Sequence, residues 1–346
     1  MTSRHWVLVN RPRGALKRTD LERTSRPLLL PGDDEVLVRV LYLAMDPAIR
    51  GFMNATGNYA APVAIGDPVR GMVLGQVVRS RSTTLSEGQV VWGFGSWSDY
   101  VSGPATQFHP VSLDADFDLP AYAHVLGTIG LTAYYGLIDI AALAPGDTVL
   151  VSAAAGAVGS LVGQIAKIKG ASRVVGIAGG AAKCALAVER YGYDSCIDYK
   201  AVEDLSGAIG HALPNGIDVH FESVGGAILE AAIDHLSKNA RVAICGLISR
   251  YNAAHAEGGP SNLWNLVVKT AQIRGFLVSD ILGRSDRTVA MLEVIACWIK
   301  QGKLNYDVDV REGFDTIPDV YNCLFKGTHT GRLIVKIADP ESPGGG

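Results

Sequence analysis

A glycine-containing loop between two apolar runs is the segment whose residue types and spacing point most directly to chemistry. The strand-like run 148–152 leads into Ala153-Ala-Ala-Gly-Ala-Val-Gly159, and a helix-like run follows. The loop matches Gly-x-Gly-x-x-Gly with Ala154 in the first place, so Gly156 would let a ligand approach the backbone and Gly159 would let the helix pack on the strand. Strand, loop and helix together predict a pyrophosphate site, and the alternative is a packing turn of small residues. The residues predicted to hold the pyrophosphate are Gly156, Ala157, Val158 and Gly159.

The end of the second predicted strand indicates which dinucleotide this loop would bind. An NAD site places Asp or Glu there, about 20 residues after the loop, to bind the ribose 2′-hydroxyl. In this chain the segment reads Gly176-Ile-Ala-Gly-Gly-Ala-Ala-Lys183, and the first acidic residue after it is Glu189. Because a carboxylate would repel a 2′-phosphate and the Lys183 ammonium would attract it, the sequence predicts NADP(H). Lys183 could instead be a solvated lysine in the first helical turn.

Histidine and cysteine, the usual zinc ligands, are scarce in the first third of the chain. Residues 1–120 contain no cysteine, their histidines are His5 and His109, and His124 follows just beyond. Nicotinamide enzymes of two domains often bind a catalytic zinc, which needs Cys or His ligands and an open fourth position. The segment Gly71-Met-Val-Leu-Gly-Gln-Val-Val78 lies where such enzymes carry Gly-His-Glu, and it has neither His nor Glu. We therefore predict no metal, and a hydride acceptor that is already activated, such as an alkene conjugated to a carbonyl.

Composition and charge limit the class of protein. The chain has 346 residues, of which 48% are hydrophobic and 19% charged, as in a globular protein of about two domains. Its net charge of -3 gives no reason to expect nucleic acid or an anionic membrane surface as a partner. The runs 121–138 and 148–166 lack charged residues, but glycines interrupt them, which favours buried core over a membrane span. The five cysteines are widely spaced and the N-terminus lacks a signal-peptide pattern, so we expect a cytoplasmic protein.

The elements that must position these residues change in character near residue 121. The preceding residues form short runs rich in Val, Gly and Pro, with turn residues about every eight to twelve positions, as in a small β barrel or sandwich. From there, apolar strands alternate with Ala-rich helices, which is typical of βαβ units over a parallel sheet. The strand-like tail 331–336 is expected to return to the first domain. We predict a discontinuous barrel-like catalytic domain, 1–120 plus 305–346, and a NADP-binding domain at 121–304.

The second domain should contain a regular series of strands and helices. The predicted strands are 148–152, 173–177, 195–197, 217–221, 241–245 and 273–276. The helices between them are predicted to begin near Gly159, Ala181, Ser206, Ala227 and Ser261, and a longer amphipathic helix is predicted over 286–301.

A set of short motifs, in this order along nearly the whole chain, resembles the zinc-independent medium-chain dehydrogenase/reductase family. The similar branch holds prostaglandin reductases, alkenal double-bond reductases and curcumin reductases. The resemblance implies an α/β fold with a GroES-like β-barrel catalytic domain plus a Rossmann doubly wound parallel-sheet domain. It also implies a homodimer that pairs through the edge strand 273–276. The motifs are Tyr42-Leu-Ala-Met-Asp-Pro47, Arg50-Gly51, Gly130-Leu-Thr-Ala-Tyr134, Ala153-Ala-Ala-Gly-Ala-Val-Gly159, Asp198-Tyr-Lys200, Ser223-Val-Gly-Gly226, Gly246-Leu-Ile-Ser-Arg-Tyr-Asn252, Phe276-Leu-Val278 and Gly331-Arg332.

The resemblance also assigns roles to residues of the site. Lys183 and Tyr199 would contact the 2′-phosphate of NADPH. Tyr251 would lie in the active site, where a phenol can donate a hydrogen bond to a developing enolate oxygen or to the ribose hydroxyl that holds it. The alternative for Tyr251 is a buried structural tyrosine. The cofactor-binding residues implied beyond the glycine loop are Lys183, Tyr199, Ser223, Cys245, Gly246, Leu247, Ile248, Ser249, Phe276, Leu277, Val278, His329 and Gly331.

The chain departs from the pattern of this family at several positions. Ser223 stands where the family usually has Asn, and His329-Thr-Gly-Arg332 replaces Asn-x-Gly-Lys, so that both cofactor contacts are in question. The family's Gly-Met-Pro-Gly reads Gly127-Thr-Ile-Gly130 here, on the expected substrate side. Tyr59 and Trp92 could line a substrate pocket or belong to the core.

These observations favour an NADPH-dependent reductase of carbon–carbon double bonds conjugated to a carbonyl. Its partner would be a small α,β-unsaturated ketone or aldehyde, with hydride delivered to the β-carbon. An NADPH quinone oxidoreductase shares every cofactor feature and differs only in substrate. A methyltransferase also uses a glycine loop, but the loop here lacks an acidic residue and a barrel-like domain precedes it. A non-catalytic NADPH-binding sensor remains the third alternative.

Overall fold

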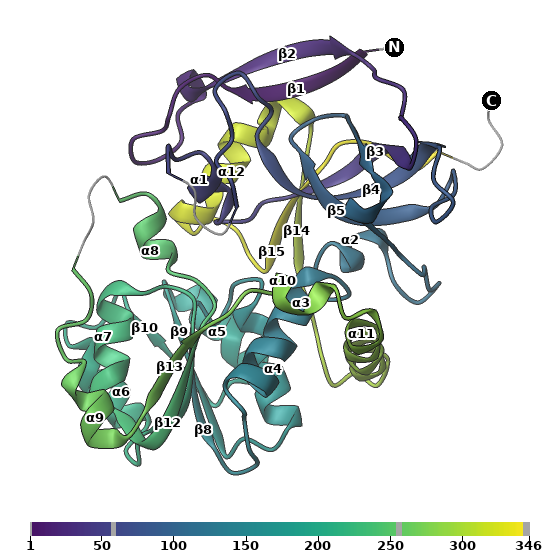
Figure 1. Cartoon of the computed structure of the whole chain (residues 1–346). Helices are drawn as coiled ribbons and strands as arrows, with labels where there is room; N and C mark the ends of the chain where they lie inside the picture. The colour runs from purple at the N-terminus through teal and green to yellow at the C-terminus, as the bar shows by residue number, and fades with distance from the viewer. Residues whose placement is uncertain (1, 57–59, 254–257, 342–346) are drawn as a thin grey trace. The chain divides into compact units, whose positions relative to one another are not determined.

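A computed structural model describes residues 2–56, 60–253 and 258–341 of the chain. Contacts divide the chain into two compact units, Met1–Ala123 with Val308–Gly346, and His124–Asp307 (Figure 1). The boundaries expected from the sequence, at residues 120 and 304, lie three residues before those of the units, 123 and 307.

The second unit is built on a parallel sheet, and its order confirms the doubly wound fold class. Within the described residues the sheet has six strands in the order β10-β9-β8-β11-β12-β13, and every neighbouring pair is parallel. The order reverses between β8 and β11, which is where such sheets bind dinucleotides. The strands are β8 (Thr148–Ser152), β9 (Arg173–Ala178), β10 (Ser195–Asp198), β11 (Ile217–Glu222), β12 (Leu236–Ile244) and β13 (Gln272–Gly275).

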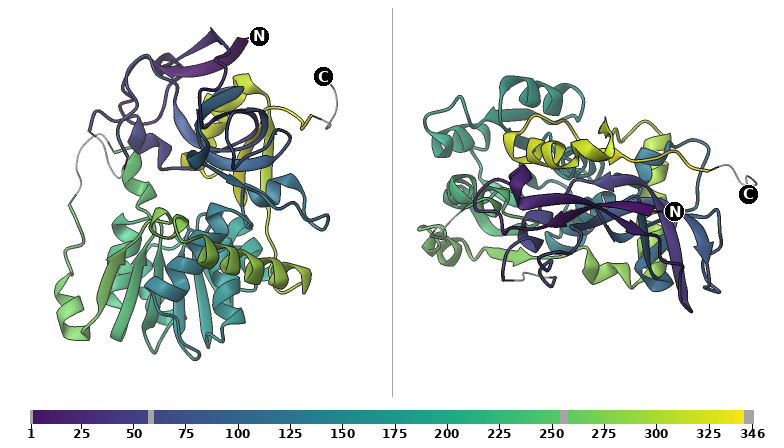
Figure 2. Two further views of the ribbon diagram at one scale, coloured as in Figure 1. Left: turned by 45° about the vertical axis from the view of Figure 1, so that its right-hand side comes forward. Right: turned by 90° about the horizontal axis from the view of Figure 1, so that it is seen from above.

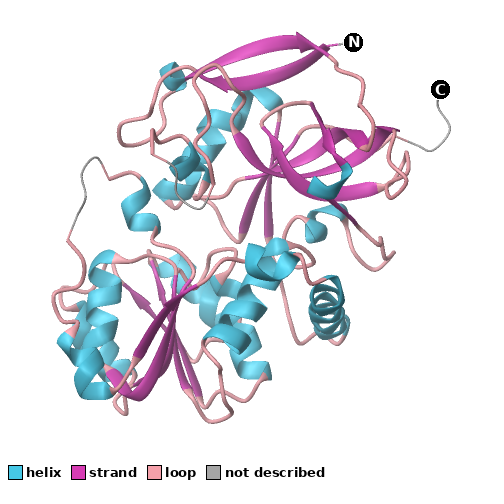
Figure 3. Cartoon of the chain, in the orientation of Figure 1, coloured by secondary structure: helices cyan, strands magenta, loops and turns pink. Residues whose placement is uncertain are grey.

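Helices cover both faces of this sheet, as Figure 3 shows. Their apolar sides are buried against the strands; on one face Ile209 and Ile228 pack with Leu150 and Val175 of the sheet. The helices of that face are α6 (Leu205–Ala212), α7 (Gly226–Asp234) and α9 (Trp264–Lys269). The other elements of the unit include α3 (Thr128–Tyr134), α4 (Gly159–Ile168), α5 (Ala181–Glu189), α8 (Ile248–Tyr251), α10 (Ser279–Leu282) and α11 (Ser285–Lys300).

Two predicted boundaries in this unit were wrong. The strand β12 begins at Leu236, five positions before the predicted 241, because Leu236 already pairs with Ile217 across a register shift. This start was missed in the sequence because the polar residues Ser237, Lys238 and Asn239 are typical of a turn. The helix expected from Ser261 begins at Trp264, because the N–H and hydroxyl of Ser261 both bind Glu230 instead.

The first unit is a mainly antiparallel β structure with its own core. Its main sheet runs β14-β15-β3-β4-β5-β7 over the described residues, with β6 paired to β3. The C-terminal segment supplies both β14 and β15, and β15 pairs with β3 in an antiparallel ladder. The strands are β3 (Glu35–Ala44), β4 (Arg70–Ser80), β5 (Val90–Ser96), β6 (Tyr100–Pro104), β7 (Phe108–Pro110), β14 (Val308–Glu312) and β15 (Arg332–Lys336).

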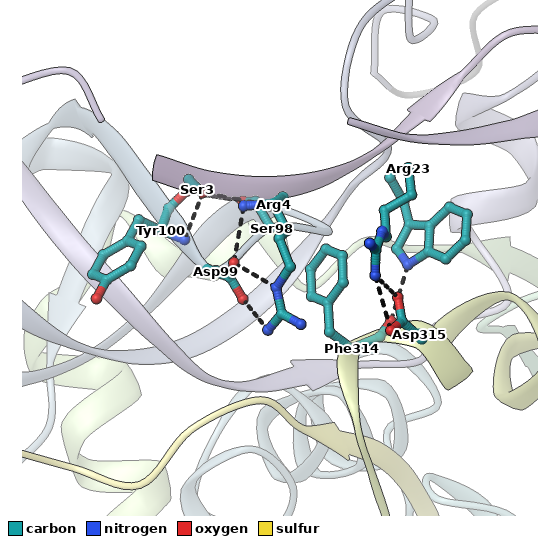
Figure 4. A network of polar contacts seen from close by, with 9 residues as sticks. Ser3, Arg4, Arg23, Ser98, Asp99, Tyr100, Phe314 and Asp315 are labelled. Carbon is teal, nitrogen blue, oxygen red and sulfur yellow. Dashed lines mark hydrogen bonds and ion pairs between the residues drawn. The ribbon is translucent and has the colours of Figure 1, made fainter. Parts of the chain in front are cut away.

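The first unit also contains a separate hairpin of β1 (Thr2–Leu8) and β2 (Leu21–Pro27), which contacts both the N-terminal and the C-terminal part of the unit. The guanidinium of Arg4 donates to both oxygens of Asp99, at 2.9 and 2.8 Å (Figure 4). On the same hairpin, Arg23 pairs with Asp315 at 2.7 Å. The helix α12 (Ile317–Lys326) lies next to the hairpin in Figure 2 and shares its apolar core.

The two charge-free runs of the sequence become buried elements. The run 121–138 contains α3, and 148–166 contains β8 and most of α4. Among the described residues, no helix combines the length and the apolar character needed to cross a membrane.

Candidate cofactor-binding site

The glycine loop leaves β8 at the point where the strand order reverses. Ala153 has a left-handed backbone, with φ at 51°, and Ala154 donates its N–H to the carbonyl of Ile177 on β9, at 3.0 Å. A Cβ at Gly159 would lie 2.3 Å from the Ala153 carbonyl oxygen, so only glycine fits at the start of α4. The third position of the motif is therefore required by packing, and the first helical turn presents N–H groups that have no partner within the helix.

The neighbouring strand explains why alanine can occupy the first place of the motif. Ala154 is completely buried. A Cβ added at Gly176 of β9 would lie only 2.6 Å from the Ala154 Cβ, so any side chain at position 176 would clash with it. The missing side chain at position 176 thus makes room for the methyl group at position 154. The loop is also anchored from outside, since the buried His124 ring bonds the Ala157 carbonyl through Nε2 at 3.1 Å.

This packing gives a testable prediction at Gly159. Changing Gly159 to alanine should lower the free energy of unfolding by about 1–3 kcal/mol, because the new methyl group must displace loop backbone. Urea denaturation measures the loss. Gly283→Ala is the matched control, since a Cβ at that position has no neighbour within 4 Å and its φ of -75° suits any residue. Equal stability of the two variants would show that the loop accommodates a side chain at position 159.

Two lysines and a tyrosine gather at the turn that follows β9. A Cβ at Gly179 would lie 2.9 Å from the Tyr199 ring and 3.0 Å from the Lys200 Cε, so both side chains lie against this turn. Asp198 holds the arrangement together, since its Oδ1 accepts the N–H groups of Gly180 at 2.8 Å and Lys200 at 3.0 Å. Lys183 stands in the first turn of α5.

The electrostatics of this cluster favour an anion. Burial, and then the positive charge of Lys200, lower the pKa of Lys183. A bound phosphate would relieve the repulsion between the two ammonium groups. Lys200 was absent from the predicted site residues, although it belongs to the quoted motif Asp198-Tyr-Lys200, which was the signal that could have found it.

The loops after β11 and β12 are joined to each other by hydrogen bonds. Ile248 donates its N–H to the Ser223 carbonyl at 3.1 Å, and the Ser249 hydroxyl donates to the Val224 carbonyl at 2.6 Å. The Ser223 hydroxyl faces the Cys245 thiol and has no nitrogen or oxygen partner among the described residues. Burial raises the pKa of Cys245 to about 12, so its thiol stays protonated. A buried hydroxyl of this kind fits a further polar ligand.

Tyr251 is the last residue of α8, which follows β12. Its phenol oxygen accepts the Leu247 N–H at 3.4 Å, and within the described residues its own O–H is not committed to another acceptor. A Cβ at Gly246 would lie 3.1 Å from this oxygen, so the glycine allows the close approach. Burial raises the pKa of Tyr251, which keeps the phenol a neutral hydrogen-bond donor.

The segment Phe276–Val278 follows the edge strand β13. The Phe276 ring is core, because it packs edge-on against Tyr135 and Phe221 with ring centroids 5.7 and 6.1 Å away. The Phe276 side chain is therefore occupied, whereas the Leu277 side chain is exposed. The N–H groups of Phe276 and Leu277 donate to the Ile244 carbonyl at 3.4 Å and to Asp280 at 3.3 Å, so the predicted backbone contacts of this segment stay a prediction.

The parallel sheet brings most of the predicted residues to one edge, and two of the predicted residues belong to the first unit. The carboxyl ends of parallel strands meet at the same edge, so the loops after β8, β9, β10, β11, β12 and β13 lie together. His329 and Gly331 belong to the first unit, where His329 Nδ1 bonds the Cys323 carbonyl at 3.2 Å and Gly331 has φ of 61°.

The residues expected on the substrate side have mixed outcomes. Trp92 stacks on His109 with ring centroids 4.1 Å apart, between β5 and β7. Tyr59 lies outside the described residues. A Cβ at Gly130 would lie 1.9 Å from the Val125 carbonyl oxygen, so this glycine is required by the backbone turn before α3.

Comparisons with known proteins point the same way as this fold and site. Residues 4–111 match a family described as the N-terminal domain of oxidoreductase, and residues 157–296 match one described as zinc-binding dehydrogenase. The chain is 36% identical to the NADPH-dependent curcumin reductase of Escherichia coli over 98% of both chains. It is also 36% identical to the NADP-dependent 2-alkenal reductase of Nicotiana tabacum, again over 98% of both.

A solved structure extends the likeness to three dimensions. CurA from Vibrio vulnificus in complex with NADPH has a TM-score of 0.90 and 36% identity, covering 97% of this chain and 100% of that one. Fold and site define a two-unit oxidoreductase scaffold of the Rossmann type. The chain belongs to the zinc-independent medium-chain dehydrogenase/reductase family, in the branch of prostaglandin, alkenal double-bond and curcumin reductases. One matched family is described as zinc-binding, yet the described residues hold no group of three or more His, Cys, Asp or Glu placed for a metal.

Proposed function

We propose that this protein is an NADPH-dependent reductase of carbon–carbon double bonds conjugated to a carbonyl group. The observation that carries the proposal is the pair Lys183 and Lys200 beside a glycine loop at the sheet's point of reversal. A nicotinamide dinucleotide with a 2′-phosphate fits this arrangement. The named activities of the curcumin and 2-alkenal reductases support the substrate class.

The residues of the second unit divide between the parts of this cofactor. Residues Gly156 to Gly159 would hold the pyrophosphate, and Lys183, Tyr199 and Lys200 the 2′-phosphate. The Ser223 hydroxyl, the segment Cys245 to Ser249 and the backbone of Phe276 to Val278 would hold the nicotinamide half, with His329 and Gly331 as further proposed contacts. NADPH, when bound, supplies a hydride.

Tyr251 is the proposed catalytic residue. After hydride reaches the β-carbon, the electron pair of the double bond moves toward the carbonyl oxygen, which becomes an enolate. The uncommitted phenol O–H of Tyr251 would donate to this oxygen or to the ribose hydroxyl that holds it. A proton then arrives at the α-carbon and completes the saturated ketone or aldehyde.

The test of this function is consumption of NADPH, followed by near-ultraviolet absorbance, with a panel of 2-alkenals, enones and quinones. NADH serves as the control cofactor. Turnover of enals or enones to saturated products with NADPH alone is the expected result. Turnover of quinones alone would identify a quinone reductase, and NADPH binding without any turnover would favour a sensor.

We further propose that the protein is a cytoplasmic homodimer. All four residues of the edge strand β13 are exposed, and the adjacent α9 leaves Trp264 70%, Val267 63% and Val268 59% exposed. An unpaired edge beside apolar side chains suits a second copy of the chain, which would continue the sheet. All five cysteines are free thiols, in keeping with a reducing compartment.

The dimer gives a prediction of its own. Changing Trp264 to glutamate should shift the protein from dimer to monomer, because a charge would be buried in the apolar contact. Light scattering after size-exclusion chromatography measures the mass. Val289→Glu is the control, since Val289 is also 53% exposed. It lies on α11, which packs on α3 and α10. A monomeric unmodified protein would refute the proposed dimer.

A further inference from the structure

A histidine and a glutamate form a completely buried pair at the end of β11. His220 and Glu222 lie two positions apart on the same face of the strand, and Nε2 of the ring lies 2.7 Å from Oε2 of the carboxyl group. Neither residue appears among the predicted site residues, and neither has a place in the proposed chemistry. Such a pair needs an explanation, because burying two ionisable groups costs free energy unless every polar atom is satisfied.

Counting protons shows that the pair is neutral as a whole. The other ring nitrogen, Nδ1 of His220, lies 3.1 Å from the Leu150 carbonyl, which can only accept, so Nδ1 carries a proton. A second proton lies between Nε2 and Oε2. Burial tends to raise the pKa of Glu222, but the contact with His220 and the backbone hydrogen bonds outweigh it and lower the pKa.

The other oxygen of Glu222 collects donors from two loops of the candidate site. Oε1 accepts the Ser152 hydroxyl at 2.8 Å, the Gly225 N–H at 2.9 Å and the Val224 N–H. Ser152 in turn accepts the Ser223 N–H at 2.7 Å. One carboxylate oxygen therefore fixes three successive peptide groups, directly or through one hydroxyl.

The backbone of Glu222 holds the next loop as well. Its carbonyl accepts the N–H of Cys245 at 2.8 Å and of Gly246 at 3.3 Å. Gly225 and Gly226 follow with φ of 80° and 57°, a conformation that this turn can adopt because both are glycine. The loops that begin at Ser223 and at Cys245 thus both depend on this one residue.

We infer that Glu222 is a positioning residue of the cofactor site. Its Oε1 shapes the loop after β11, whose Ser223 and Val224 carbonyls in turn accept the Ile248 and Ser249 N–H groups, and the pair that it forms with His220 is neutral as a whole. Neutralisation matters at this edge, because an uncompensated carboxylate would repel the phosphates proposed to bind there. The inference rests on the proposed function for the identity of the ligand. The shaping of the loops is a property of the chain alone.

A carboxylate at the opposite end of the same strand provides the matched control. Asp218 accepts the Thr148 N–H and hydroxyl, both at 2.9 Å, and the Ser237 hydroxyl at 2.5 Å. It is as well connected as Glu222, but it lies at the amino end of β11. Loss of Asp218 should therefore lower stability without altering the cofactor loops.

The experiment measures amide hydrogen exchange in the cofactor-free protein and NADPH binding by fluorescence titration. Glu222→Ala should speed exchange in residues 223–226 and, through the carbonyls of that loop, in residues 248–249, and it should raise the Kd for NADPH about tenfold, the equivalent of one lost hydrogen bond of about 1.4 kcal/mol. Glu222→Gln keeps an acceptor oxygen, and its amide can donate to His220, so its Kd should stay within about threefold. Asp218→Ala should lower Tm and leave both readouts unchanged.

The outcomes separate this inference from the proposed function. Folded Glu222→Ala with unchanged exchange and unchanged Kd would overturn the inference, and so would a Glu222→Gln variant as impaired as Glu222→Ala. If Glu222→Ala does not fold, Ser152→Ala tests the same link, and unchanged exchange at residues 223–226 would overturn it. Absence of NADPH binding in the unmodified chain would count against the proposed function, while the exchange data would still decide the role of Glu222.

Discussion

Replacing Lys183 and Lys200 together with alanine should remove the preference for NADPH over NADH. The two ammonium groups lie at one turn, where they repel each other in the free protein. Both would attract a 2′-phosphate bound at this turn. Since a charge-assisted hydrogen bond contributes about 1.5–3 kcal/mol, each substitution alone should raise the KM for NADPH about 10- to 100-fold. Steady-state kinetics with an enone at saturation measure both cofactors.

The KM for NADH should barely change, because NADH has no group at this position. Lys167→Ala is the control variant, since Lys167 lies on α4 and pairs with Asp194 at 2.8 Å, away from the turn after β9. Equal losses for NADPH and NADH in the Lys183 and Lys200 variants would contradict the 2′-phosphate assignment. A loss with Lys183→Ala and none with Lys200→Ala would restrict the site to the lysine identified from the sequence.

Changing Tyr251 to phenylalanine should lower kcat about 100-fold and leave the KM for NADPH within about threefold, because a positioned proton donor typically contributes 10²- to 10⁴-fold. The phenol O–H is the group lost, and its oxygen accepts only the long hydrogen bond from Leu247 among the described residues. The fold should therefore persist. Single-turnover measurement of NADPH oxidation isolates the chemical step from product release.

The control for this variant is another phenol that accepts a backbone N–H. Tyr122 accepts the Asp114 N–H at 2.7 Å and belongs to the first unit, so Tyr122→Phe removes a comparable hydrogen bond. Its kcat should equal that of the unmodified protein. An unaltered kcat for Tyr251→Phe would show that the tyrosine is structural, which was the alternative considered from the sequence.

Local sequence patterns were enough to predict the core of the dinucleotide scaffold. Three short-range features were enough: the glycine loop, the alternation of strand and helix, and the absence of an acid after the second strand. Each can be read within a short stretch of sequence. Gly159 shows this plainly, since its closest neighbour would be Ala153 in the same loop. The start of β12 was missed for the complementary reason: its polar residues obtain their strand conformation from pairing with β11, not from their own preference.

The sequence by itself therefore determined the class of fold, and it located the glycine loop and the lysine near the end of the second strand from which we predict the phosphate contacts. Only the tertiary structure placed Lys200 beside the turn of Lys183, and only it joined Ser152 to Glu222 across 70 positions of chain. Spacing in sequence does not decide which strands become neighbours in a sheet, because that choice also depends on burial and register over the whole unit. The contacts between strands, which shape the loops of the candidate site, are settled at that level.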